Sequence, residues 1–311
     1  MMLIAICICT FRRPEGLKAT LRGIARLRFG AIPQPKLHVV VVDNEGCHAT
    51  RGVVEAFEAT GISISYTVEH RRGISAARNA CLDLAPAEAD LIAFLDDDVV
   101  PRRDWLEKLL VALERTGAEA ATGPYDAVYK RNTPEWIRAG RFFSSPRAKA
   151  PGNHDRIDFG VMGNILLSAA FLRKSGLRFD DRFGLIGGED RKFYTDMFEA
   201  GARFAWARDA VVDHHVSPDR LRFAYIIRRE FCIGCTAAIL KRSEPSSGRR
   251  LMEYGAQTIG KLVLKIVVLA PAALLAAIRR NAFRKVKPVL DIANLSGRLY
   301  GLFGQKYELY G

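Results

Sequence analysis

Short apolar runs alternate with amphipathic segments through the first half of the chain. Four of these runs predict strands, and those that are apolar along most of their length are typical of strands buried on both faces of a sheet. They lie at residues 3–11, 36–44, 62–70 and 91–98. We therefore predict four strands in this half, with those at 3–11, 36–44 and 91–98 buried.

The segments that follow these strands carry apolar residues at helical spacing. They lie at residues 14–27, 52–60, 75–84 and 104–116. In the first of them Leu17, Leu21 and Ile24 fall on one face, and Pro14 stands near the start, where a helix tolerates proline. Strands that alternate with helices predict an α/β fold with a mostly parallel central sheet.

Polar and aromatic residues stand where the predicted strands end. In chain order they are Thr10, Phe11 and Arg12, then Asp43 and Asn44, then Arg71 and Arg72, and finally Asp96, Asp97 and Asp98. Ligands of such sheets bind beyond the carboxyl ends of the strands. These side chains should therefore converge on one edge of the sheet.

The second half of the chain is less regular and then becomes helical. Residues 163–172 predict a strand that runs into a helix, and a Gly-rich turn precedes a helix over about 189–200 that stops at Gly201. From about residue 220 the apolar residues follow a helical repeat. We therefore expect a sheet-based domain over 1–220 and a helical C-terminal region over 221–311.

Charge separates the same two regions. The chain has 47 Lys and Arg against 34 Asp and Glu, a net charge of +13, and residues 201–311 hold 19 of these bases against 8 of the acids. A basic segment can bind nucleic acid or an anionic membrane surface, and the apolar residues beside it favour the membrane.

The most apolar stretch of the tail is too short to cross a bilayer. Its uncharged part, 266–278, falls below the ~20 residues that a spanning helix needs. Lys261 and Lys265 precede it, Arg279 and Arg280 follow it, and Pro271 is expected to interrupt it. This pattern predicts an interfacial or re-entrant helix rather than a spanning one.

The cysteines indicate neither a disulfide framework nor a metal site. Six are scattered through the chain, and the N-terminus lacks the features of a secretory signal, which favours free thiols in a reducing compartment. Cys232 and Cys235 form one CxxC pair within a helical pattern. Without a second pair, packing is the expected role of both.

The acidic triplet is the strongest chemical signal. Asp96 and Asp98 are two residues apart at a strand end, so an extended backbone would place them on one face, where they repel each other unless a cation lies between. Clustered carboxylates suit Mg²⁺ or Mn²⁺. The alternative is a solvated acidic loop before a helix that Asp104 caps.

Two further segments carry candidate chemistry. In GGEDRKF, Glu189 and Asp190 fall in a first helical turn, where the helix dipole alone favours acids, but either carboxylate also suits a general base. His214 and His215 end an apolar run, so alternation directs only one of them into a site. A neutral imidazole there could complete a metal shell.

Together these motifs resemble a known family. CTFRRPEGL, VVDN, RRGISAARNACL, LDDDVVP and GGEDRKF, in this order and spacing, resemble the family 2 glycosyltransferases with a GT-A fold. The resemblance covers about residues 1–235. The tail, which ends GRLYGLFGQKYELYG, is similar to that of bacterial members that build exopolysaccharide or other surface glycans.

The resemblance implies a role for particular residues. The positions that match the family's nucleotide-binding residues are Cys9, Thr10, Phe11, Asp43, Arg71 or Arg72, Gly73, Asp96 and Asp97. The positions that match its metal-binding residues are Asp96, Asp98 and His214. Asp190 matches the catalytic base, with Glu189 beside it, and Gly163 and Asn164 would lie on the acceptor side.

The implied activity is inverting sugar transfer that depends on Mn²⁺ or Mg²⁺. The donor would be a nucleotide sugar, for which we expect a UDP-sugar, and the acceptor a saccharide or lipid-linked glycan. The enzyme would be cytoplasmic and peripherally bound to the inner face of the membrane through its tail. The alternatives are an inactive nucleotide-sugar-binding protein at the membrane surface and a metal-dependent nucleotidyltransferase.

Overall fold

The computed structural model describes residues 1–144, 156–157, 160–243, 248–278 and 282–308. Contacts divide the chain into two compact units. The first comprises Met1–Val128, Phe143–Gly184 and Glu189–His215, and the second comprises Tyr129–Phe142, Leu185–Gly188 and Val216–Gly311. The domain boundary at residue 220 stays a prediction.

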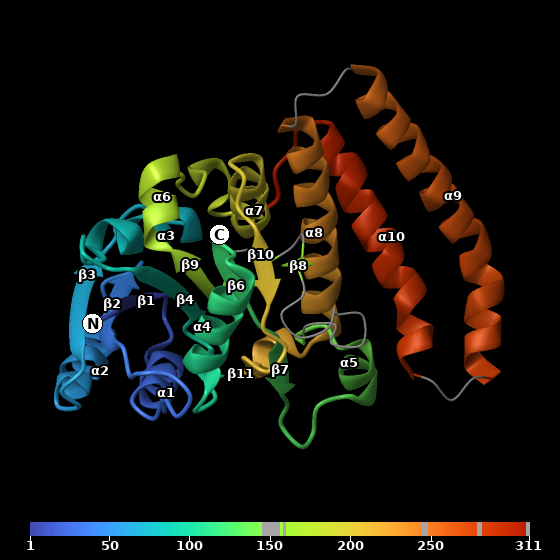
Figure 1. Cartoon of the computed structure of the whole chain (residues 1–311). Helices are drawn as coiled ribbons and strands as arrows, with labels where there is room; N and C mark the ends of the chain where they lie inside the picture. The colour runs from blue at the N-terminus through green and yellow to red at the C-terminus, as the bar shows by residue number, and fades with distance from the viewer. Residues whose placement is uncertain (145–155, 158–159, 244–247, 279–281, 309–311) are drawn as a thin grey trace. The chain divides into compact units, whose positions relative to one another are not determined.

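An eight-stranded sheet forms the centre of the first unit (Figure 1). The four predicted strands are β1 (Leu3–Thr10), β2 (Lys36–Asp43), β3 (Ser63–Val68) and β4 (Leu91–Asp96). The others are β6 (Ala120–Thr122), β8 (Arg156–Ile157), β9 (Asn164–Ser168) and β10 (Phe204–Trp206). Their order is β3-β2-β1-β4-β9-β6-β10-β8, and only β9 and β8 run against the rest.

Helices cover both faces of this sheet. They are α1 (Pro14–Ile24), α2 (His48–Glu58), α3 (Ile74–Leu84), α4 (Trp105–Thr116), α6 (Ala169–Ser175) and α7 (Glu189–Glu199). Buried residues of α1, α2 and α4 share one apolar cluster with the sheet, and those of α3, α6 and α7 share the other. The α/β prediction is confirmed, although α2 begins at His48 and not at residue 52.

The ends of these helices follow from local chemistry. Gly117 ends α4 in the left-handed conformation (φ +59°), and its N–H donates to Leu113 O at 2.8 Å. The hydroxyl of Ser168 accepts from Phe171 N at the start of α6, where the predicted strand at 163–172 does run into a helix.

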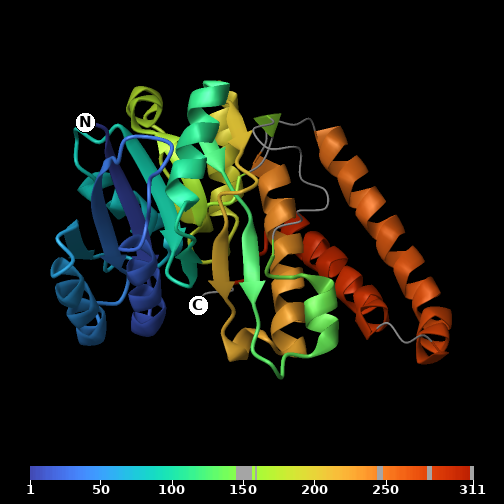
Figure 2. The ribbon, with the colours of Figure 1, turned by 60° about the horizontal axis from the view of Figure 1, so that its bottom comes forward.

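A small three-stranded sheet adjoins the acidic triplet. Its order is β5 (Val99–Pro101), β11 (Val212–His215) and β7 (Tyr125–Val128), and Figure 2 shows β7 and β11 side by side. Strand β4 ends at Asp96, and Asp97 and Asp98 form a turn into β5. The strand geometry therefore does not persist to Asp98, and the condition for placing Asp96 and Asp98 on one strand face is not met.

The second unit is helical, as the tail pattern predicts. It contains α5 (Glu135–Gly140), α8 (Phe223–Ser243), α9 (Gly248–Ile278) and α10 (Ala282–Leu302), and α10 lies between α8 and α9 (Figure 1). Helix α9 runs through position 271, so the expected interruption at Pro271 is wrong. Within the described ranges, no helix has the length and apolarity needed to cross a bilayer.

Candidate active site

The carboxyl ends of three neighbouring strands bring the predicted donor-side residues to one level. Strand β1 lies between β2 and β4, and in its register Thr10 pairs with Asp43 and Cys9 with Asp96. The order reverses at this point, because the chain places β2 and β3 to one side of β1 and β4 to the other. Such a reversal opens a crevice at the strand ends where ligands bind.

Asp97 anchors the acidic turn to the fold. Its side chain is buried and accepts from Thr10 Oγ1 at 2.8 Å and from Arg13 Nη1 at 3.1 Å. Burial raises the pKa of Asp97 to about 6, against the lowering effect of Arg13. Asp97 thus faces the interior, and a direct role in donor binding stays a prediction.

Asp98 and His214 meet at the other side of this turn. The pairing of β5 with β11 sets His214 opposite Val99, and His215 N donates to Asp98 O at 2.9 Å. His214 Nε2 then lies 3.6 Å from Asp98 Oδ2, which is also 3.0 Å from Arg13 Nη1. His214 is buried and His215 is exposed, so alternation directs only the former inward.

The His214 ring has one bonded nitrogen and one without a hydrogen-bond partner. Nδ1 lies 3.2 Å from Phe143 O, a carbonyl that can only accept, so Nδ1 carries the proton of a neutral ring. Buried Nε2 makes no hydrogen bond and presents its lone pair near a carboxylate. A carboxylate oxygen and an imidazole nitrogen at this separation are both suitable ligands for a divalent metal cation.

Asp96 has different partners from those of Asp98. Its Oδ2 accepts from Tyr125 Oη at 3.0 Å, and its Oδ1 lies 3.5 Å from Arg78 Nη2. Gly163 lies against this pair, because a Cβ there would collide with Tyr125 Oη and Asp96 Oδ2. Asn164, expected on the acceptor side, is fully buried and bonds Trp105 within the fold.

The acid pair at the start of α7 divides into two environments. Glu189 is buried and accepts from Arg78 Nη1 at 2.6 Å, while burial raises the pKa of its carboxyl to about 7. Asp190 is half-buried and accepts from the N–H of Arg191. Among the described residues, Glu189 therefore has a cationic partner and Asp190 forms no ion pair.

Asp43 and Asn44 organise the loops at the end of β2. Asp43 is fully buried and accepts from the N–H groups of Glu45 and Cys47 and from the Tyr66 hydroxyl. Asn44 donates to Glu69 O and Arg71 O and accepts from Gly73 N. It thereby fixes the loop that carries the two predicted arginines.

That loop presents its arginines to the rim of the site. Arg71 and Arg72 are exposed, and the Arg72 guanidinium lies 5.6 Å from the Phe11 ring centre. Gly73 has φ +122° and lies against Gly184, so a side chain would strain the turn. The Cys9 side chain contacts Cys81, with 3.7 Å between the two sulfurs.

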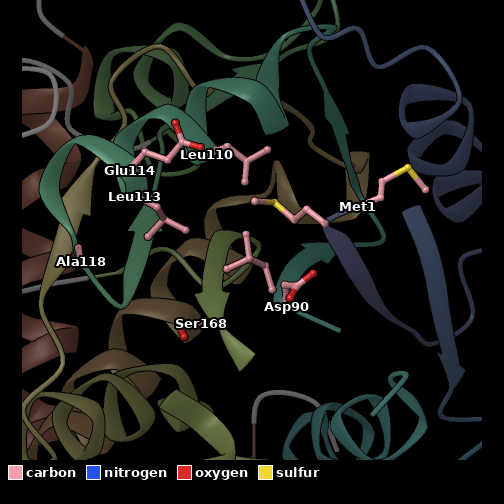
Figure 3. Close-up of a pocket in the computed structure, with 9 residues that line it drawn as sticks. Met1, Asp90, Leu110, Leu113, Glu114, Ala118 and Ser168 are labelled. Atoms are coloured by element: carbon pink, nitrogen blue, oxygen red, sulfur yellow. The ribbon is translucent and has the colours of Figure 1, made fainter. Parts of the chain in front are cut away.

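A pocket on the first unit lies away from the predicted site residues (Figure 3). Its volume is about 510 Å³, and Met1, Asp90, Leu110 and Ser168 are among the residues around it. Asp90 and Ser168 stand at the opposite end of β4 from Asp96, as the register of β4 with β9 shows. This pocket therefore contains none of the predicted site residues.

The structure adds three residues that the sequence pattern did not single out: Arg78, Tyr125 and Tyr194. Tyr194 stands one helical turn after Asp190 on α7; it is buried, and its hydroxyl has no hydrogen-bond partner. Nothing in the spacing distinguishes these residues from core positions. Across the described residues, no three His, Cys, Asp or Glu side chains form a ready metal site.

Comparison with known proteins places this geometry in a family. The sequence matches the family description "Glycosyl transferase family 2" over residues 5–175. It is 36% identical to "Succinoglycan biosynthesis protein ExoM" of Rhizobium meliloti, covering 99% of this chain and 96% of that protein. It is 22% identical to "Glycosyltransferase AglE" of Haloferax volcanii, over 74% of this chain and 71% of that protein.

Solved structures share the fold at low sequence identity. Mannosyltransferase PcManGT from Pyrobaculum calidifontis, in complex with GDP-Man and Mn²⁺, has a TM-score of 0.64 at 18% identity and covers 97% of this chain and 88% of its own. TarS 1–349 of S. aureus, in complex with UDP-GlcNAc, has a TM-score of 0.54 at 15% identity, with coverages of 99% and 93%.

These matches confirm the expected fold class, a GT-A-like α/β sheet flanked by helices. The family match covers more than half of the chain, and a relative above 30% identity spans nearly all of it. The chain is therefore a glycosyltransferase and belongs to glycosyltransferase family 2.

Proposed function

We propose that this glycosyltransferase transfers a sugar, with inversion, from a nucleotide-sugar donor to a saccharide or lipid-linked glycan in exopolysaccharide biosynthesis. The observation that carries the proposal is the pairing of Asp98 with an unbonded His214 Nε2 at the carboxyl edge of the sheet. The names of the relatives, succinoglycan biosynthesis for one and a UDP-GlcNAc complex for another, support the pathway and the donor class.

The donor set at this edge fits a divalent cation. Asp98 and His214 would hold Mn²⁺ or Mg²⁺ from the protein side, with Asp96 nearby, because carboxylate oxygen and neutral imidazole both suit these ions. When bound, the cation stabilises negative charge on the donor's diphosphate. The complex of PcManGT with GDP-Man and Mn²⁺ supports this assignment.

The donor's nucleotide would lie over the crevice between β1, β2 and β4. Phe11 and the exposed Arg71 and Arg72 supply an aromatic face and positive charge there, suited to a base and a diphosphate. The other proposed donor-binding residues are Cys9, Thr10, Asp43, Gly73, Asp96 and Asp97. We favour a UDP-sugar as donor.

Asp190 serves as the general base in the proposed reaction. Its carboxylate takes the proton of an acceptor hydroxyl, whose oxygen forms a bond to the anomeric carbon of the donor sugar. The bond from that carbon to the diphosphate breaks, and the nucleoside diphosphate leaves with the electron pair. Attack opposite the leaving group inverts the anomeric configuration.

Replacing the base tests the reaction. Asp190→Asn should lower kcat for sugar transfer by about 10²- to 10⁴-fold, while Asp196→Asn on the same helix, which removes only the pair with Lys192, should retain activity. The assay measures release of nucleoside diphosphate with a panel of nucleotide sugars. Release of pyrophosphate instead would indicate a nucleotidyltransferase, and no turnover in the wild type would indicate a binding protein.

Adjacent histidines provide a matched test of the metal site. His214→Ala should raise the Mn²⁺ concentration for half-maximal activity by about 10- to 100-fold, because the variant loses a buried ligand. His215→Ala should leave it unchanged, because His215 is exposed. Equal metal dependence in both variants would contradict the assignment.

We also propose that α9 binds an anionic membrane surface on the cytoplasmic side. Ile259, Val263, Ile266 and Val267 are spaced to share one helix face, and each is more than half exposed. Arg250 and Lys261 are exposed on the same helix. Exposed apolar side chains flanked by bases are typical of helices that lie in the membrane interface.

Vesicle sedimentation tests the membrane proposal. Ile259→Ser/Val263→Ser/Val267→Ser should weaken binding to vesicles that contain anionic lipid by about 100-fold, since each change removes roughly 1 kcal/mol of apolar burial. Val128→Ser, an isolated exposed apolar residue, serves as the control. Unchanged sedimentation of the triple variant would rule out this face of α9 as the anchor.

A further inference from the structure

A single buried guanidinium lies between the two acidic parts of the site. Arg78, on α3, is only 6% exposed. Its Nη1 donates to Glu189 Oε1 at 2.6 Å, and its Nη2 lies 3.5 Å from Asp96 Oδ1. The guanidinium also lies 5.5 Å from the ring centre of Phe179. Arg78 thus joins the end of β4 to the start of α7.

The two carboxylates that Arg78 contacts lie close in sequence to the proposed metal ligand and the proposed base. Asp96 opens the acidic turn that leads to Asp98, and Glu189 directly precedes Asp190. Among the described residues, the side-chain hydrogen bonds and ion pairs that link the end of β4 to the start of α7 run through Arg78. The guanidinium is therefore the described connection between the metal-side turn and the base.

The frame around Arg78 is fixed from its own helix. The neighbouring Asn79 accepts from Phe179 N at 2.9 Å and donates to Phe179 O at 2.8 Å. At the start of α3, Ile74 N donates to Gly184 O at 3.1 Å. These bonds hold the segment that leads to α7 against α3, so they support the position of α3 independently of the two carboxylates that Arg78 contacts.

We propose that Arg78 is a positioning residue that sets the placement of Asp190 relative to the donor-binding turn by holding Glu189 and Asp96 at once. This inference rests on the proposed function. Arg78 touches neither donor nor acceptor in it. A planar guanidinium can bind two carboxylates at once in a fixed geometry. The single ammonium group of a lysine cannot reproduce this geometry.

A charge-removal cycle separates positioning from simple stabilisation. Arg78→Met alone leaves Glu189 buried without its cation and should destabilise the fold. Arg78→Met/Glu189→Met removes both charges and should restore the melting temperature, because replacing a whole buried ion pair by apolar residues is often neutral or better. If the Arg78–Glu189 pair only stabilises the fold, this double variant recovers activity.

If the proposal is right, the double variant folds correctly but keeps a low kcat. Its kcat should remain about 100-fold below that of the wild type, the scale expected when a reacting group moves by about 1 Å, while KM for the donor changes less than about threefold. Arg78→Lys should fold and bind donor but show the same selective loss of kcat. Arg203→Met, which removes an exposed pair with Glu119, is the control and should behave as wild type.

The outcomes distinguish this inference from the proposed function. Sugar transfer by the wild type together with full kcat in the double variant or in Arg78→Lys would overturn the positioning role alone. Absence of metal-dependent transfer in the wild type would overturn the proposed function itself. A loss of kcat confined to the Arg78 variants, with donor affinity retained, supports the inference.

Discussion

At the scale of single residues, Glu107 stabilises a neighbouring loop, a role that its position in a helix does not predict. It lies in the first turn of α4 and is buried. Its carboxylate accepts from the N–H groups of Gly30 and Ala31, at 2.7 and 2.5 Å, in the loop between α1 and β2. The bond to Ala31 N, followed by others from the same loop, lowers the pKa of Glu107.

Replacement by the neutral isostere tests this role. Glu107→Gln should lower the free energy of unfolding by about 1–3 kcal/mol at pH 7, because bonds from N–H groups to a carboxylate are stronger than those to an amide. A carboxyl with a lowered pKa stabilises the fold above its unfolded pKa and loses this effect as pH falls through the folded value. Urea unfolding should therefore show the difference between Gln and wild type shrinking in acid.

Glu114→Gln on the same helix is the matched control, since Glu114 is exposed. It should change the free energy of unfolding by less than about 0.5 kcal/mol at either pH. A pH-independent loss in Glu107→Gln would mean that side-chain shape, and not charge, supports the loop.

At the scale of elements, close backbone approach decides how α8 and α10 pack. A Cβ at Gly297 would collide with Phe231 O, and one at Gly234 would collide with Asn294 O. Asn294 also donates to Glu230 O at 3.2 Å. The two helices thus meet at glycines, which indicates a contact that larger residues cannot make. Cys232 and Cys235 are buried in α8, as expected for packing residues.

Glycine substitutions should separate packing from helix propensity. Gly297→Ala should lower the free energy of unfolding by about 1–3 kcal/mol, because the added methyl forces the helices apart. Gly260 on α9 has open space where a Cβ would lie. Gly260→Ala should therefore raise the free energy of unfolding by about 0.5–1 kcal/mol. Thermal unfolding of both variants checks the sign, and a stabilising Gly297→Ala would contradict the packing.

At the scale of the whole molecule, ligand binding should increase the free energy of unfolding. A donor and a cation that bind only the folded state stabilise it by RT ln(1 + [L]/Kd), about 2.7 kcal/mol at 100 times Kd. We expect UDP with Mn²⁺ to raise the melting temperature by several degrees, and EDTA to reverse most of this shift.

Two aspartates make this whole-molecule experiment specific. In Asp98→Asn the part of the shift that depends on Mn²⁺ should disappear, because the variant lacks a proposed ligand. Asp83→Asn removes an exposed partner of Arg178 and should retain the wild-type shift. A metal-dependent shift that survives in Asp98→Asn would place the cation elsewhere.

Much of the fold followed from local patterns, and the site followed only in part. The buried strands and the helices between them were predictable because each burial pattern is set within a few neighbouring residues. The resemblance to the family 2 glycosyltransferases is confirmed, and the family match over residues 5–175 contains four of the five motifs. The sequence could not show that Asp97 and Asp43 turn inward, because the donors that hold them, such as Thr10 and Tyr66, come from other strands.

The sequence by itself determined the alternation of strands and helices, the acids and bases at the strand ends, and the basic, helical tail. Only the tertiary structure decided which of them meet. The turn after Asp96 and the register of β5 with β11 bring His214 to Asp98, and the packing of α3 places Arg78 between Asp96 and Glu189. The physical reason is the sequence separation of the contacting residues. Hydrophobic periodicity depends on residues close together in the chain, whereas these contacts join residues far apart in the chain, and their sequence separation does not predict that they are close in space.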